Sequence, residues 1–102
     1  MPQTAANQVR IIGGAWRRRL IRFPPAEGLR PTPDRVRETL FNWLGQTLAG
    51  KRCLDLYAGS GALTLEAASR GAALAVAVDR NRVLVTALHA TAATLGASAL
   101  AA

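Results

Sequence analysis

The chain has 102 residues, which is room for one small domain. Half of the residues are hydrophobic and 19% are charged, a composition that excludes the intrinsically disordered class. Charged residues interrupt every apolar run before the ~18 residues that a membrane helix needs, and nothing at the start of the chain resembles a secretion signal. The single cysteine, Cys53, excludes an internal disulfide, so we expect a reducing, cytoplasmic compartment and no membrane partner.

The positive charge lies in one half of the chain. Residues 1–52 contain ten Lys or Arg and three acidic residues, whereas residues 53–102 contain three of each, so the net charge of +7 belongs to the first half. A basic segment in front of a neutral one predicts contact with a polyanion, which in a cytoplasmic protein is usually nucleic acid. A solvated, arginine-rich surface without a partner is the alternative.

Residues 9–33 are expected to form a basic β-hairpin and a proline-rich linker, behind a disordered terminus at 1–8. Short β-like segments at 9–12 and 20–23 flank a glycine pair, the pattern of a hairpin. Its cationic side chains would surround Trp16, an arrangement that binds phosphates and stacks on bases; packing of Trp16 within the hairpin is the alternative. The cationic residues are Arg10, Arg17, Arg18, Arg19 and Arg22.

A helix is predicted from about residue 33 to 49. Thr32 can cap its start, Asp34 favours the positive end of the helix dipole, and Gly50 ends it. Apolar residues recur at helical spacing and predict one buried face, formed by Val36, Leu40, Trp43, Leu44 and Leu48.

The sequence of residues 34–102 predicts an α/β fold. It corresponds to the first βαβα part of a Rossmann-like domain. Two short apolar strands alternate with two helices, so the sheet should be parallel and its connection right-handed. The expected strands lie at 53–57 and 73–78, and the expected helices at about 62–70 and 83–95.

A glycine turn follows the first strand, and an acidic residue ends each strand. The turn has the sequence Ala58-Gly59-Ser60-Gly61; Asp55 precedes it, and Asp79 lies 18 residues after Gly61, near the interval at which a carboxylate meets ribose hydroxyls. Asp55 would repel a pyrophosphate but suits the ammonium group of S-adenosylmethionine. The alternative is that Asp55 caps the turn and Asp79 caps the next helix. A nicotinamide dinucleotide site is disfavoured by Asp55 and by Thr64 at the third glycine position.

The chain resembles the RsmD-type small-subunit ribosomal RNA guanine-N2 methyltransferases from about residue 10 to 95. The motifs that carry the resemblance are Arg-Ile-Ile-Gly-Gly-Ala-Trp-Arg at 10–17, Gly-Leu-Arg-Pro-Thr-Pro-Asp-Arg-Val-Arg-Glu-Thr-Leu-Phe-Asn-Trp-Leu at 28–44, and Leu-Asp-Leu-Tyr-Ala-Gly-Ser-Gly-Ala-Leu at 54–63. The long middle motif makes the likeness specific, because the glycine turn alone would indicate any class I methyltransferase.

The resemblance implies a partial class I, Rossmann-like methyltransferase fold with an S-adenosylmethionine cofactor. Asp55, Gly59 and Gly61 would line the methionine end, Asp79 would hold the ribose, and Arg80 would lie near the adenine. The cofactor-binding set implied in full is Thr32, Asp55, Tyr57, Ala58, Gly59, Ser60, Gly61, Asp79 and Arg80. The segment with Arg30, Arg35 and Glu38 would close over the cofactor and the target base. Ribosomal RNA or the small ribosomal subunit would lie on Arg10, Trp16, Arg17, Arg18, Arg19, Arg22, Arg30 and Arg35.

The chain departs from the family in two places. Arg18 stands where the family usually has glycine, and the Asn/Asp-Pro-Pro-aromatic catalytic loop is missing, since Phe23-Pro24-Pro25-Ala26 has neither the amide nor a following aromatic residue. Family members are nearly twice as long and build seven strands, of which two are expected here. We therefore expect the N-terminal half of a monomeric methyltransferase, inactive alone and with no assigned catalytic residue.

Other residues offer weaker signals. His89 is expected to be solvated, Glu66 either supports the helix dipole or contacts the glycine turn, and Tyr57 has strand packing as its alternative. One Cys and one His cannot assemble a metal site, so no metal is expected. Methylation of the exocyclic amine of a guanine is thus the leading hypothesis; a non-catalytic RNA-binding remnant is the alternative, and a nicotinamide-dependent oxidoreductase is a weaker third.

Overall fold

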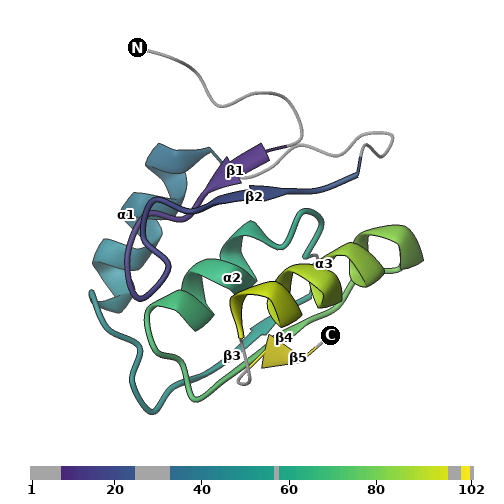
Figure 1. The fold of residues 1–102 in the computed structure, drawn as a ribbon. Helices are drawn as coiled ribbons and strands as arrows, with labels where there is room; N and C mark the ends of the chain where they lie inside the picture. Colours follow the sequence, from purple (N-terminus) through teal and green to yellow (C-terminus); the bar gives the residue numbers. More distant parts are fainter. Residues whose placement is uncertain (1–7, 25–32, 57, 97–99, 102) are drawn as a thin grey trace.

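The computed structural model describes residues 8–24, 33–56, 58–96 and 100–101. The chain forms layers: a β-hairpin lies over two helices, α2 and α3, and a parallel sheet lies beneath them, with helix α1 at one side (Figure 1). This arrangement confirms the predicted α/β fold. No helix in the described residues is long and apolar enough to cross a membrane.

The predicted hairpin is present. Strand β1 (Gln8–Arg10) pairs antiparallel with β2 (Leu20–Arg22), and Val9 faces Ile21 with both side chains buried. Gln8 pairs with Arg22, so the strand begins one residue inside the segment that was expected to be a disordered terminus. Both strands are shorter than predicted, because the chain turns from residue 13.

Helix α1 (Asp34–Leu44) differs from its prediction in length and in its buried face. Gly45 adopts a φ of 112°, outside the helical region, and ends the helix five residues before Gly50. The side chains that α1 buries are Arg37 and Phe41, whereas Trp43 is 81% exposed. The apolar-face prediction is confirmed for Leu48, which is buried after the helix end, and for Leu40, which packs against the Phe41 cluster. It was wrong for the exposed Val36, Trp43 and Leu44, because α1 buries Arg37, whose acceptors hydrophobic periodicity does not detect.

The sheet contains one strand more than expected. Strands β3 (Arg52–Asp55), β4 (Leu74–Ala77) and β5 (Leu100–Ala101) run parallel in the order β3-β4-β5. Helices α2 (Ala62–Ser69) and α3 (Arg82–Leu95) connect them and lie on the same face (Figure 1). A two-residue strand such as β5 is too short to leave an alternating pattern in the sequence.

The main core lies between the hairpin and the sheet. Ile21 and Phe23 of the hairpin side pack in one buried cluster with Leu65 of α2 and Leu88 of α3. Trp16, half-buried, packs against the same cluster, which agrees with the packing alternative for this side chain. The hairpin is therefore part of the domain core and not a separate appendage.

Candidate functional site

The glycine turn joins β3 to α2. Gly59 and Gly61 have φ values of 55° and 83°, in the left-handed region that favours glycine. A Cβ on Gly61 would lie 2.6 Å from Cδ1 of Leu88, so the turn also needs glycine to pack against α3. Ser60 is buried, and its Oγ accepts from the Ala62 N–H at 3.3 Å at the start of α2.

Asp79 holds the glycine turn from the neighbouring strand. Its Oδ2 accepts from the Gly59 N–H at 2.9 Å, and its Oδ1 accepts from the Asn81 N–H at 2.8 Å. The cap of α3 is Asn81, whose side chain accepts from the N–H groups of Val83 and Leu84. The alternative that Asp79 caps the next helix is thus wrong.

Asp55 lies at the carboxyl end of β3, half-buried. Its Oδ2 accepts from the Thr64 hydroxyl at 2.9 Å, and its backbone oxygen accepts from the Val78 N–H at 2.8 Å. Ala58, also half-buried, donates its N–H to the Val78 oxygen at 3.0 Å. These bonds place the ends of β3 and β4 beside each other, with a carboxylate on each.

A crevice opens beside Asp79. Its volume is about 420 Å³, and its lining combines apolar and charged side chains: Leu56, Val78, Asp79 and Arg80. The sequence-predicted residues Asp55, Ala58, Gly59, Ser60, Gly61, Asp79 and Arg80 come together at this edge of the sheet. Tyr57 and Thr32 lie outside the described residues.

The predicted basic residues lie along the hairpin, and all five are exposed: Arg10, Arg17, Arg18, Arg19 and Arg22. Arg35 is exposed on α1, whereas Arg30 lies outside the described residues. Arg18 adopts a φ of 73°, which strains a non-glycine residue. This geometry gives a physical reason for glycine at that position.

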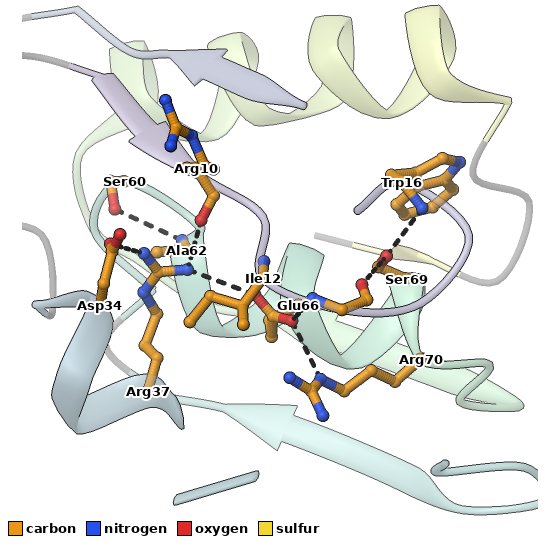
Figure 2. Close-up of polar contacts among 11 residues, drawn as sticks. Arg10, Ile12, Trp16, Asp34, Arg37, Ser60, Ala62, Glu66, Ser69 and Arg70 are labelled. Carbon is orange, nitrogen blue, oxygen red and sulfur yellow. Dashed lines mark hydrogen bonds and ion pairs between the residues drawn. The ribbon is translucent and has the colours of Figure 1, made fainter. Parts of the chain in front are cut away.

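Glu66 is the site residue whose role the sequence leaves undecided. Its carboxylate is fully buried and accepts from the N–H of Ile12 at 2.9 Å and of Gly13 at 2.8 Å (Figure 2). It also pairs with Arg37 at 3.2 Å and with Nε of Arg70 at 2.9 Å. The carboxylate thus joins the hairpin loop, α1 and α2. A single charged residue in the apolar sequence of α2 was the signal for such a role.

Arg37 and Ser69 extend these contacts, and sequence reasoning missed both. Arg37, fully buried, donates to the backbone oxygen of Arg10 at 2.8 Å and pairs with Asp34. Ser69 Oγ donates to the Gly13 oxygen at 2.6 Å and accepts from the Trp16 N–H at 3.0 Å (Figure 2). Both residues are polar, and hydrophobic periodicity detects only apolar side chains, so the pattern does not indicate that they are buried.

No group of three or more His, Cys, Asp or Glu side chains in the described part of the chain could hold a metal ion. His89 is exposed on α3, as expected.

Comparisons with known proteins identify the family of the chain. The family model described as Conserved hypothetical protein 95 matches residues 9–102. The Ribosomal RNA small subunit methyltransferase D of Escherichia coli strain K12 is 52% identical over 94 residues, which cover 92% of this chain and 48% of the relative. The protein of the same name from Haemophilus influenzae is 45% identical over 94 residues, covering 92% and 49%.

A solved structure from Escherichia coli, the candidate methyltransferase yhhF, superposes with a TM-score of 0.82 at 48% sequence identity and covers 91% of this chain and 50% of that one. The chain therefore spans about half the length of the relatives it matches. The fold is that of a partial Rossmann-like methyltransferase domain. From its family match and these identities, the chain belongs to the Conserved hypothetical protein 95 family, the RsmD-type methyltransferases.

Proposed function

We propose that this chain forms the cofactor-binding and RNA-contacting half of a methyltransferase that moves the methyl group of S-adenosylmethionine to the exocyclic N2 amine of a guanine in small-subunit ribosomal RNA. We also propose that the whole protein is cytoplasmic and monomeric. Support for the class of reaction comes from the relatives, whose names describe a ribosomal RNA methyltransferase.

The observation that carries the proposal is the pair of carboxylates beside the glycine turn. Asp55 and Asp79 end adjacent parallel strands, at the edge where α/β folds bind ligands. A ligand with an ammonium group and a ribose, and without a phosphate, suits two carboxylates at the same edge of the sheet. The apolar walls of Leu56 and Val78 in the crevice beside Asp79 offer an adenine ring a place to lie.

Asp79 would bind the ribose while it keeps its contact with the glycine turn. Its Oδ2 accepts from the Gly59 N–H. A ribose hydroxyl can donate to the same carboxylate, because each carboxylate oxygen accepts more than one hydrogen bond. Arg80, at the rim of the crevice, is placed beside the adenine in this proposal.

The exposed arginines of the hairpin would hold the RNA. Guanidinium groups pair with phosphate oxygens in a bidentate geometry, and five of them lie within one short hairpin. Such contacts release counterions from the RNA, so binding should weaken steeply as salt is added.

Isothermal titration of the full chain with S-adenosylmethionine tests the cofactor assignment. We expect binding that Asp79→Ala abolishes and that Asp79→Asn weakens less, because the amide keeps one acceptor oxygen for the turn. Nicotinamide adenine dinucleotide should not bind. Absence of S-adenosylmethionine binding at millimolar concentration, or equal binding by Asp79→Ala, would contradict the assignment.

An RNA-binding remnant without catalysis remains the second candidate, favoured by one observation. The basic hairpin is complete in this chain, whereas the sequence has no Asn/Asp-Pro-Pro-aromatic loop to orient a target amine. Both candidates allow RNA binding without methyl transfer by this chain, so isothermal titration with S-adenosylmethionine separates them. Binding of the cofactor and of RNA supports the methyltransferase half, and RNA binding without cofactor binding supports the remnant.

A further inference from the structure

The turn between β1 and β2 carries the densest positive charge of the hairpin. Residues 13–19, which we name the basic turn, include Arg17, Arg18 and Arg19, all exposed. Its backbone is closed by bonds from the Arg18 N–H to the Ile11 oxygen at 2.8 Å and from the Ile11 N–H to the Arg19 oxygen at 2.9 Å. These bonds hold the turn in one shape, including the left-handed conformation of Arg18.

Helix α2 holds the basic turn from below. Glu66 accepts from the N–H groups of Ile12 and Gly13, and Ser69 Oγ bonds the oxygen of Gly13 and the N–H of Trp16. The Ser69 backbone oxygen accepts from the Ala15 N–H at 2.7 Å. A Cβ on Gly14 would lie 1.9 Å from that same oxygen, which shows how closely the turn approaches α2.

The same helix begins at the proposed cofactor site. Its cap is Gly61 of the glycine turn, and its last residue is Ser69. At ~1.5 Å per residue, the eight residues of α2, Ala62–Ser69, separate Gly61 from Ser69 by about 12 Å. The basic turn and the glycine turn therefore lie at opposite ends of one short, rigid helix (Figure 1).

We infer that Glu66 and Ser69 are positioning residues, which fix the basic turn at a set distance from the cofactor site so that RNA held by the turn presents its base at that site. This inference rests on the proposed function. Glu66 also pairs with two buried guanidinium groups, those of Arg37 and Arg70, and Asp34 supplies a second carboxylate to Arg37. Ser69 carries no charge, so its contribution is restricted to the hydrogen bonds with the turn.

The test uses Ser69→Ala in the full chain, because Glu66→Gln removes the buried carboxylate that pairs with Arg37 and Arg70 and can prevent folding. We expect Ser69→Ala to weaken binding to small-subunit ribosomal RNA about fivefold, by loss of two hydrogen bonds that hold the turn. The dependence of log affinity on log salt should become shallower by about one, since fewer arginines contact phosphates together. Affinity for S-adenosylmethionine should stay unchanged, which a general loss of fold would not permit.

The fluorescence of Trp16 reports whether the basic turn stays packed against α2. In a Trp43→Phe background, Trp16 is the single tryptophan, and its half-buried ring should move to water and shift its emission to longer wavelength in Ser69→Ala. Ser69→Thr keeps the hydroxyl and should restore part of the RNA affinity. Thr94→Ala is the matched control, because it removes an exposed hydroxyl that bonds within α3.

The outcomes distinguish the inference from the proposed function. Wild-type binding to RNA, together with an emission shift and unchanged RNA affinity in Ser69→Ala, would overturn the inference and leave the proposed function standing. Equal losses of RNA and cofactor affinity would also overturn it, because the residue would then act on the whole fold. A wild-type chain that binds cofactor and not RNA would overturn both the RNA assignment and the inference.

Discussion

The two sides of the β3-β4-β5 sheet differ in how completely they are covered. On the hairpin side, helices α2 and α3 and the two-stranded hairpin bury a continuous core, and Leu65 is 0% exposed at its centre. On the other side, Leu54 of β3 is 64% exposed. The hairpin, although its basic sequence suggests a separate extension, therefore belongs to the covered side of the fold.

The two edges of β3 also differ in how they are covered. Within the described residues, β3 pairs on one side with β4 and has no strand on its other side. A groove of about 170 Å³ follows this edge, with Leu44 of α1 and Leu54 of β3 among its lining residues. In the polar interior, by contrast, every buried side-chain polar atom of the described residues has a hydrogen-bond partner.

The largest effect is expected at Glu66. Replacing it with Ala removes the carboxylate from two buried arginines and from two backbone N–H groups. We expect a loss of about 3–5 kcal/mol in the free energy of unfolding, measured by urea denaturation. Glu38→Ala, an exposed carboxylate on α1, should change it by less than about 0.5 kcal/mol. Similar losses in the two variants would mean that the buried network does not stabilise the hairpin side.

A pair of leucines compares the two sides directly. Leu65→Ala opens a cavity in the hairpin-side core and should cost about 2–5 kcal/mol of unfolding free energy. Leu54→Ala removes a mostly exposed side chain and should cost less than about 1 kcal/mol. Urea denaturation of both variants measures the difference, and an equal cost would show that the Leu54 face is covered in solution.

Elements with a local sequence pattern were predictable, whereas contacts between residues far apart in the sequence were not. The hairpin, the glycine turn and the alternation of strand and helix were predictable, because each has a local pattern. The inward orientation of Arg37 was not, because its partner Glu66 lies 29 residues away. The bonds from Ile12 and Gly13 to Glu66 span 54 and 53 residues, and no local pattern reports contacts at that separation.

Substitutions at two glycines distinguish the effect of close packing on stability from the effect of backbone strain. Gly14 and Gly50 have nearly equal φ values, 82° and 79°, but a Cβ on Gly14 would meet the Ser69 backbone, whereas Gly50 has nothing within 4 Å. Gly50→Ala should cost about 1 kcal/mol from its left-handed conformation alone. Gly14→Ala should cost about 2–3 kcal/mol, because the turn must also move away from α2. Thermal unfolding of the two variants measures the gap, and equal melting temperatures would contradict the close approach.

The smallest effect on stability, and opposite in sign, is expected at Arg18. Arg18→Gly relieves the left-handed strain and should stabilise the fold by about 1 kcal/mol, while RNA binding weakens through loss of one cation. Arg17→Gly removes the same charge from a position without that strain, so it should weaken RNA binding without a gain in stability. Chemical denaturation and RNA titration of both variants measure the two effects. A stability loss in Arg18→Gly would contradict the strain argument.

A crystal structure of the chain with bound S-adenosylmethionine would identify the ligand of the Asp55–Asp79 edge. We predict the ribose hydroxyls on the Asp79 carboxylate, the ammonium group near Asp55, and the adenine between Leu56 and Val78. Density for the compound at another part of the surface, with both carboxylates directed away from it, would contradict the assignment of this edge as the cofactor site.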